Sequence, residues 1–193
     1  MNATLNALRP ALSLFLLLSA LTGLAYPLLV TALAQTLFPE RAAGSLIRDG
    51  EQVTGSALIG QPFSSPGHFW SRPSATATQP YNGTASGGSN LGANNRVLVD
   101  AVAQRIAALR EADPDNRAPV PVDLVTASAS GLDPDISLAA ARYQAARVAR
   151  ARGLDPAAVD ALIEGHAHHP WLGFVGEPRV NVLALNRALA ALR

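Results

Sequence analysis

The stretch Ala11–Ala34, ALSLFLLLSALTGLAYPLLVTALA, decides how this chain is organised. It carries no charged side chain. As an α-helix at roughly 1.5 Å per residue it would be about 36 Å long, which is enough to cross a bilayer core of about 30 Å. The sequence therefore predicts a retained membrane anchor. A kink is expected at Pro27, because proline lacks the N–H that continues the helical hydrogen bonds.

Two other interpretations of this apolar segment stay open. Residues 32–35, ALAQ, resemble the cleavage site of a secretory signal, although the apolar run exceeds the roughly 7–15 residues typical of such signals. A buried helix of a soluble protein would need apolar neighbours, which are scarce in the rest of the chain. For an anchor, Arg9 favours a cytoplasmic N-terminus, whereas Arg41 and Arg48 on the far side weaken that preference.

The composition excludes several common classes of site. The formal net charge is only +1, so no basic surface for a nucleic-acid partner is expected. The chain has no cysteine, which excludes disulfides, thiolate metal sites and cysteine nucleophiles. All fifteen basic residues are arginine, so a Walker A lysine and a Schiff-base lysine are excluded as well.

The polar part of the chain, residues 39–193, suits one compact domain after an N-terminal segment of residues 1–38. In residues 44–60, Asp49-Gly50 lies between two short apolar runs, which predicts a hairpin with a type I′ turn at Asp49-Gly50. Residues 67–76 predict an extended edge segment that ends near a proline. The alternating apolar residues of 119–130 predict a strand, and the following residues to Ser137 a turn.

Helices are predicted in the second half of the domain, each after a residue that can cap it. Asn94 or Asn95 can cap the first, which stops before Pro114, and Ser137 can cap the second, which Gly153 ends. Asp155 precedes a proline at the start of the third, and a fourth ends the chain. Early strands followed by late helices predict the α+β class.

The most unusual loop is the uncharged stretch 80–95, PYNGTASGGSNLGANN. Its centre is Ser86, Gly87, Gly88, Ser89 and Asn90. Consecutive glycine N–H groups ahead of a helix can form an anion nest, which would suit the phosphates of a nucleotide. The alternative, which the residues alone favour, is a turn or bulge that glycine permits.

Three histidines lie close together near the end of the third predicted helix. His166 falls on the apolar stripe of that helix, and His168 and His169 follow at its end, where a protonated histidine suits the helix dipole. Glu164 is the only carboxylate beside them. A structural role therefore explains these residues better than a metal site, and no metal site is predicted.

Two carboxylates, Asp133 and Asp135, flank Pro134. General acid–base catalysis needs two carboxylates with separated pKa values in a pocket, and the sequence shows no pocket. Turn and capping roles explain the pair, and an acidic rim that attracts cations is the functional alternative. No catalytic residue is predicted, since no Gly-x-Ser-x-Gly elbow is present either.

Several long blocks of this sequence resemble one family. Residues 72–95, 120–137, 140–154 and 176–189 are similar to signature blocks of the C subunit of the bacterial Kdp high-affinity potassium-transporting P-type ATPase. The blocks follow the family order over nearly the whole chain. Two departures are Ala129, where the family carries a Ser-Gly-Ser-Gly form, and Ala93-Asn94, where Pro-Thr is expected.

The resemblance implies a non-catalytic subunit without a cofactor of its own, because ATP and potassium are ligands of the whole complex. Its partners would be a potassium-selective channel-like subunit, the P-type ATPase subunit, a small membrane subunit and the lipid bilayer. The resemblance also implies a single-pass protein of the cell inner (cytoplasmic) membrane. Its N-terminus would be cytoplasmic and its domain periplasmic.

Two roles follow from the resemblance. The family has been described as a catalytic chaperone that raises the ATP affinity of the ATPase subunit, with Ser86–Ser89 likened to the signature sequence of ABC transporters. A periplasmic domain could not reach cytoplasmic ATP, so a domain that assists assembly and caps the outer potassium entrance, near Asp133 and Asp135, is preferred. A membrane-tethered periplasmic hydrolase and a ligand-binding module are the alternatives.

Overall fold

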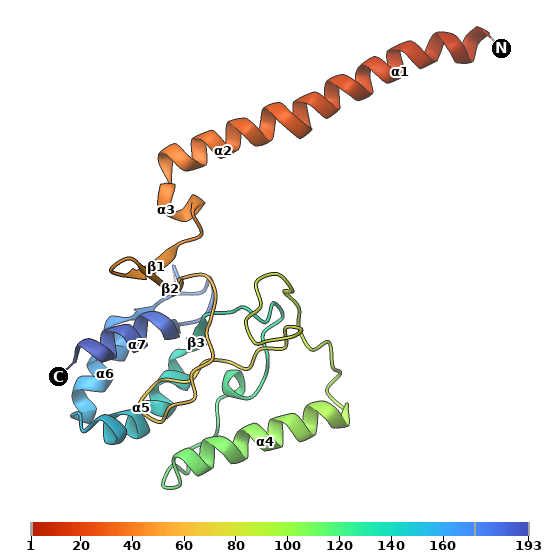
Figure 1. Ribbon diagram of the computed structural model, residues 1–193. Coiled ribbons are helices and arrows are strands. Elements are labelled where there is room, and N and C mark those ends of the chain that lie inside the picture. Colours follow the sequence, from red (N-terminus) through yellow and green to blue (C-terminus); the bar gives the residue numbers. More distant parts are fainter. Residues whose placement is uncertain (1, 172, 193) are drawn as a thin grey trace. The chain divides into compact units, whose positions relative to one another are not determined.

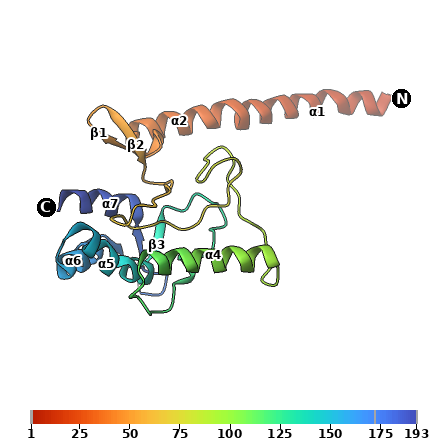
Figure 2. The ribbon, with the colours of Figure 1, turned by 60° about the horizontal axis from the view of Figure 1, so that its bottom comes forward.

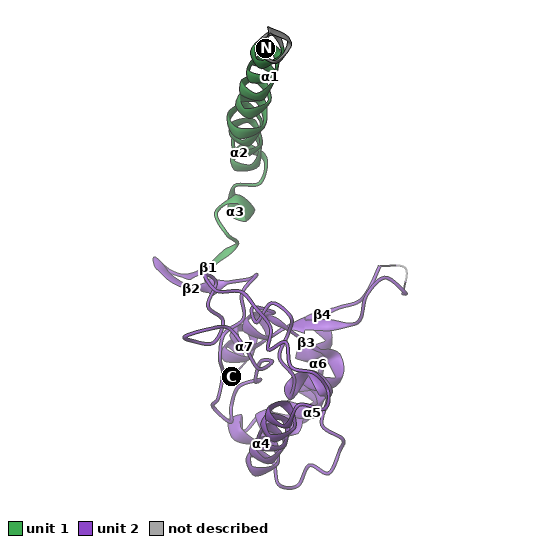
Figure 3. Ribbon diagram, turned by 90° about the vertical axis from the view of Figure 1, so that its right-hand side faces the viewer, with its two compact units in different colours: residues 1–46 green, residues 47–193 purple. Residues whose placement is uncertain are grey.

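A computed structural model describes residues 2–171 and 173–192 of the chain (Figure 1). The chain forms two compact units, residues 1–46 and 47–193, which Figure 3 shows in separate colours. Helices and strands are mixed, and one long apolar helix stands at the N-terminus, so the predicted α+β class is confirmed.

The N-terminal unit is a helical segment with one irregular turn. It consists of α1 (Asn2–Ala20), a π-helical turn η1 (Leu21–Ala25) and α2 (Tyr26–Leu37), and a short α3 (Pro39–Ala42) follows. Residues 7–37 are long and apolar enough to cross a membrane, and they contain the predicted span 11–34. The π turn lies directly before Pro27, where the proline removes an N–H, and the N–H of Tyr26 reaches back to the carbonyl of Leu21.

The predicted hairpin is present, but its turn is shifted by one residue. Strands β1 (Leu46–Asp49) and β2 (Gln52–Ser56) pair, with Gly50 and Glu51 between them. Gly50 has a φ of +60° and Glu51 does not have a positive φ. A type I′ turn needs positive φ at both central residues, so the predicted Asp49-Gly50 type I′ turn is wrong. A glycine at the first central position is instead typical of a type II′ turn.

A second sheet, which the sequence did not predict, joins three short strands. The strands β3 (Asp135–Ser137), β5 (Arg179–Asn181) and β4 (Ala167–His168) are antiparallel in the order β3-β5-β4. At its centre Val180 lies opposite Ile136, and both side chains are buried. Strands of two or three residues are too short to produce an alternating pattern. Strand β3 therefore could not be recognised within the residues that were predicted as a turn.

The second unit also contains the four predicted helices, and the predicted starts of the first three are confirmed. They are α4 (Arg96–Ala112), α5 (Leu138–Arg152), α6 (Pro156–Gly165) and α7 (Val182–Ala191). The side chains of Asn95, Ser137, Asp155 and Asn181 each accept a hydrogen bond from a backbone N–H of the first turn. Helix α5 packs on α6, and α6 on α7, beside the sheet (Figures 1 and 2).

The predicted strand within 119–130 is wrong. Residues Val122–Leu124 form a single 3-10 turn, η2. Val122 is 69% exposed, whereas Leu124 and its neighbour Val125 are both buried, which a strand of period two could not achieve. The carboxylate of Asp123 holds the turn, because it accepts hydrogen bonds from the N–H and hydroxyl of Ser137 at 2.7 and 3.2 Å.

The predicted edge segment 67–76 is wrong as well, for a different reason. Phe69 is fully buried in the core, and none of the strands in the described part of the chain pairs with its backbone. The side-chain amide of Asn186 instead bonds both the N–H and the carbonyl of Phe69, at 2.8 and 2.9 Å. Gln144 does the same for Trp70, at 2.7 and 3.2 Å. Two buried amides thus replace a neighbouring strand.

Candidate functional site

The glycine-rich loop Ser86–Asn90 packs against a second loop, residues 128–131. The N–H of Gly87 and the hydroxyl of Ser86 both donate to the carbonyl of Ser130, at 2.9 and 3.0 Å. A Cβ added at Gly88 would lie only 3.0 Å from the carbonyl oxygen of Ala129. This close approach of two backbones explains why a glycine stands at position 88.

A third segment, Ser74–Tyr81, is hydrogen-bonded to the second of these loops. The hydroxyl of Ser74 donates to the carbonyl of Gly131 at 2.7 Å and accepts from the N–H of Tyr81 at 2.9 Å. Gly131 has a φ of +67°, and a Cβ there would lie 2.6 Å from Thr76. We call residues 72–90 together with 128–133 the loop cluster.

The loop cluster uses one of the N–H groups that a phosphate nest would need. The N–H of Gly87 is already donated to Ser130, and neither Gly87 nor Gly88 has a positive φ. At the N-terminus of α4, the side chain of Asn95 accepts from the N–H of Val97 at 2.9 Å. The contacts of Ser86, Gly87 and Gly88 therefore support a packed turn at these three residues. Ser89 and Asn90 are exposed, and Asn90 has a φ of +51°.

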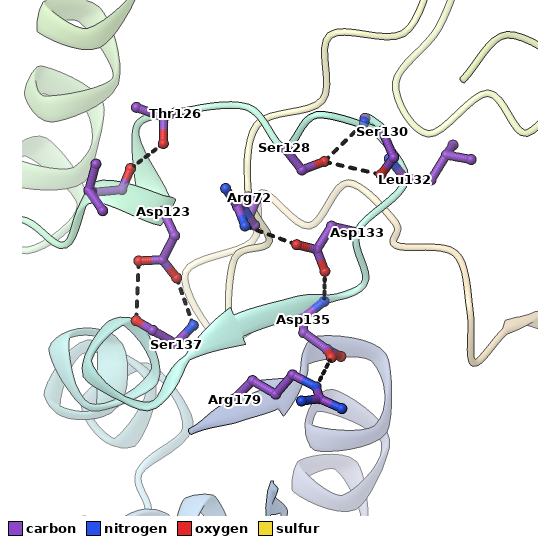
Figure 4. A network of polar contacts seen from close by, with 12 residues as sticks. Arg72, Asp123, Thr126, Ser128, Ser130, Leu132, Asp133, Asp135, Ser137 and Arg179 are labelled. Atoms are coloured by element: carbon purple, nitrogen blue, oxygen red, sulfur yellow. Dashed lines mark hydrogen bonds and ion pairs between the residues drawn. The ribbon is translucent and has the colours of Figure 1, made fainter. Parts of the chain in front are cut away.

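The two candidate aspartates lie at the edge of the loop cluster, and each is paired with an arginine (Figure 4). Asp133 contacts Arg72 at 2.9 Å, and Asp135 contacts Arg179 at 2.8 Å. One oxygen of Asp133 also accepts the N–H of Asp135 at 3.0 Å. The sequence did not single out either arginine, since Arg72 and Arg179 come from segments far apart in the chain. Their place in the family-like blocks was the only available signal.

A cavity of about 550 Å³ opens beside these ion pairs. Its charged lining is Arg72, Asp123, Asp133, Asp135, Glu177 and Arg179. Four carboxylates therefore stand against two guanidinium groups, a formal excess of two negative charges. Because Asp133 and Asp135 are paired, the excess lies with Glu177 and the buried Asp123. The wall is acidic and can attract cations.

Tyr81 supports the arginine side of this wall. Burial raises the pKa of its hydroxyl, and nearby Asp133 adds to that shift. The hydroxyl donates a hydrogen bond to the carbonyl of Arg72. A protonated Tyr81 thus fixes the backbone from which Arg72 reaches Asp133.

Sequence reasoning missed a buried arginine that holds residues 66–70, just before Arg72. Arg147 is only 4% exposed and donates to the carbonyls of Pro66 and His68 and to Gln144. Its guanidinium lies over the ring of Trp70, 4.6 Å from the centroid. Burial lowers the pKa of Arg147 to about 10, so it stays charged at neutral pH. Arg147 is one of several arginines on α5, so its sequence position alone did not distinguish it.

The histidines have structural surroundings. His166 lies at the end of α6, and its Nδ1 is 2.9 Å from the carbonyl oxygen of Leu162. His168 belongs to β4, and His169 follows it. Within residues 2–171 and 173–192, no group of three or more His, Cys, Asp or Glu side chains is placed to hold a metal ion.

Comparisons with known proteins agree with one another. The family model described as K+-transporting ATPase, c chain, matches residues 8–191. The Potassium-transporting ATPase KdpC subunit of Variovorax paradoxus is 69% identical over 186 residues, which cover 96% of each chain. The protein of the same name from Methylibium petroleiphilum is 67% identical, over 96% of this chain and 97% of its own. The protein of the same name from Sorangium cellulosum is 59% identical, over 96% of this chain and 98% of its own.

Proposed function

This chain belongs to the family of the K+-transporting ATPase c chain, and from that premise we propose that it is a non-catalytic subunit that assists assembly and caps the outer potassium entrance. The apolar helix would anchor it in the inner membrane, with the N-terminus in the cytoplasm and the domain in the periplasm. Its partners would be a potassium-selective channel-like subunit, a P-type ATPase subunit and a small membrane subunit.

The acidic cavity is the observation that carries the capping role. Its wall has two more carboxylates than guanidinium groups, and such a wall raises the local concentration of cations. The ion pairs of Asp133 and Asp135 hold the wall in shape, while Glu177 supplies exposed charge. This refines the sequence-based hypothesis, in which Asp133 and Asp135 themselves attracted the ion.

A catalytic chaperone could act without touching nucleotide. The N–H of Gly87 is used inside the loop cluster, and neither Gly87 nor Gly88 has a positive φ, which argues against a glycine nest there. We propose that any rise in the ATP affinity of the ATPase subunit passes through assembly of the complex. Ser89 is exposed, so Ser89→Cys, in a chain without other cysteines, should react in intact cells with a membrane-impermeant maleimide. Labelling only after the cells are broken would place the loop in the cytoplasm and reopen direct nucleotide contact.

Potassium uptake by the purified complex tests the capping role. Glu177→Gln removes one of the two excess negative charges without breaking an ion pair and should raise the KM for potassium, most clearly at low ionic strength. Reversing both charges, Asp133→Arg with Asp135→Arg, should raise it further. Glu51→Gln, on the hairpin turn, is the matched control. An unchanged KM in an intact complex for both Glu177→Gln and the double aspartate variant would contradict the capping role.

Co-purification in mild detergent tests assembly separately. An accessory subunit should extract with its partners as one stable complex. A hydrolase or a ligand-binding module should run alone, and only the hydrolase should turn over a substrate. Either of these results would contradict the proposed function.

A further inference from the structure

The arm that connects β4 and β5 ends in exposed aromatic side chains. Trp171 is 78% exposed, Phe174 77% and Val175 57%. Among the described residues of the second unit, Trp171 and Phe174 are the only exposed aromatic residues. We call Trp171, Phe174 and Val175 the aromatic tip. Figure 3 shows the arm projecting beyond β4.

The backbone of the arm is held in a defined turn. A bridge joins Trp171 to Val175, and the N–H of Gly173 donates to the carbonyl of Pro170 at 3.1 Å. Gly173 and Gly176 have φ values of +75° and +102°, which glycine adopts without strain. Strand β4 pairs with β5 at the base. The backbone at Trp171 and at residues 173–175 is therefore held by these contacts.

The chemistry of the arm suits the surface of a lipid bilayer. No Asp, Glu or Arg occurs between residues 165 and 176. Tryptophan and phenylalanine rings lie favourably at the headgroup level of membranes, where the indole N–H stays near water. Protein interfaces usually add arginine around their aromatic anchors, whereas the hydrogen-bonding side chains here are the indole of Trp171 and the exposed imidazoles of His168 and His169, which also suit a headgroup region.

The chain itself keeps the domain near a bilayer. The connection between the apolar helix and the second unit is residues 38–46. Fully extended at roughly 3.3–3.6 Å per residue, it spans only about 30 Å. We propose that the aromatic tip inserts into the headgroup region of the same membrane that holds the anchor. This inference rests on the proposed anchoring and adds a second, peripheral membrane contact.

Site-specific fluorescence in vesicles tests the proposal with the full-length chain. The variant Phe174→Cys carries the only thiol and is labelled with an environment-sensitive dye. The protein is reconstituted into phosphatidylcholine vesicles that contain a lipid spin-labelled near the headgroup end of its acyl chain. We expect a blue shift and loss of most of the emission. A lipid labelled near the end of the chain should quench less.

Two control variants separate the possible failures. Val97→Cys, on α4, is a similarly exposed apolar position and should stay unquenched by either lipid. Leu18→Cys, inside the apolar helix, should be quenched if the anchor spans the vesicle membrane. An unquenched label at position 18 would refute the anchoring on which the proposed function also depends.

A quenched label at position 18 with an unquenched label at 174 would refute the membrane contact alone. Quenching of the label at position 174 by aqueous iodide is then measured in the assembled complex. Protection from aqueous iodide without lipid quenching would mean that a protein subunit covers the tip. Full access to iodide would mean that the tip is free. Both results overturn the lipid proposal.

Discussion

Removing the amide of Asn186 should destabilise the domain strongly, because this side chain replaces a strand for Phe69. Asn186 is 4% exposed and Phe69 is fully buried, so water cannot satisfy the freed backbone groups. Each buried group left unpaired costs about 1–3 kcal/mol, and the N–H and the carbonyl of Phe69 would both be unpaired. The expected loss in unfolding free energy is therefore about 2–6 kcal/mol, out of the roughly 5–15 kcal/mol typical of a domain.

Urea unfolding of the full-length protein in detergent micelles, followed by tryptophan fluorescence, measures this loss. With a slope near 2 kcal/mol per molar urea, the midpoint should fall by about 1–3 M. Asn186→Leu is the decisive variant, because leucine keeps the branching of asparagine at Cγ and cannot make its hydrogen bonds. Arg187→Ala, an exposed neighbour on α7, should change stability by no more than about 0.5 kcal/mol.

Equal midpoints for Asn186→Leu and Arg187→Ala would refute the reasoning. Phe69 would then be held by its apolar contacts alone. Asn186→Asp separates the two hydrogen bonds, since a carboxylate can still accept from the N–H of Phe69 but cannot donate to its carbonyl. Its stability should lie below that of the native chain.

Three further predictions concern the loop cluster and its surroundings. Gly88→Ala should destabilise the domain by about 1–3 kcal/mol, because the new Cβ would press on the backbone of Ala129, whereas Gly87→Ala has nothing within 4 Å and should be nearly neutral. Asp123→Ala should cost about 1–3 kcal/mol by leaving the partly buried N–H of Ser137, the cap of α5, without its acceptor, and Asp123→Asn should recover part of this. Burial, reinforced by nearby guanidinium groups, lowers the pKa of His68 below its ordinary value of 6.5. The unfolded chain therefore binds the proton more readily than the folded chain. The free energy of unfolding should fall as the pH drops below about 6.5. Urea unfolding at several pH values checks all three, with His68→Gln expected to flatten the pH dependence.

Each of these predictions has a contrary outcome. Equal stability of the Gly87 and Gly88 variants would mean that the backbone of the loop cluster can move apart without cost. An unaffected Asp123→Ala variant would show that water replaces the carboxylate. A His68→Gln variant with the native pH profile would assign the acid sensitivity to other groups.

Part of the candidate site could be predicted from the sequence. Asp133 and Asp135 stood out as carboxylates in a turn, and Ser86–Asn90 as a glycine-rich loop. Their partners could not be predicted, because Arg72 and Arg179 reach the aspartates only after distant segments have packed together. The same holds for Ser130, whose carbonyl accepts from both Ser86 and Gly87.

The sequence by itself determined the apolar helix and the helices of the domain. Their causes are local: a long uncharged apolar run, and caps such as Ser137 and Asp155 that act within their own first turn. The tertiary structure alone decided the course of the other segments. Residue 69 is buried without a strand because Asn186, on the last helix, supplies its hydrogen bonds. Such pairings join residues far apart in the chain, where no local pattern can specify the partner.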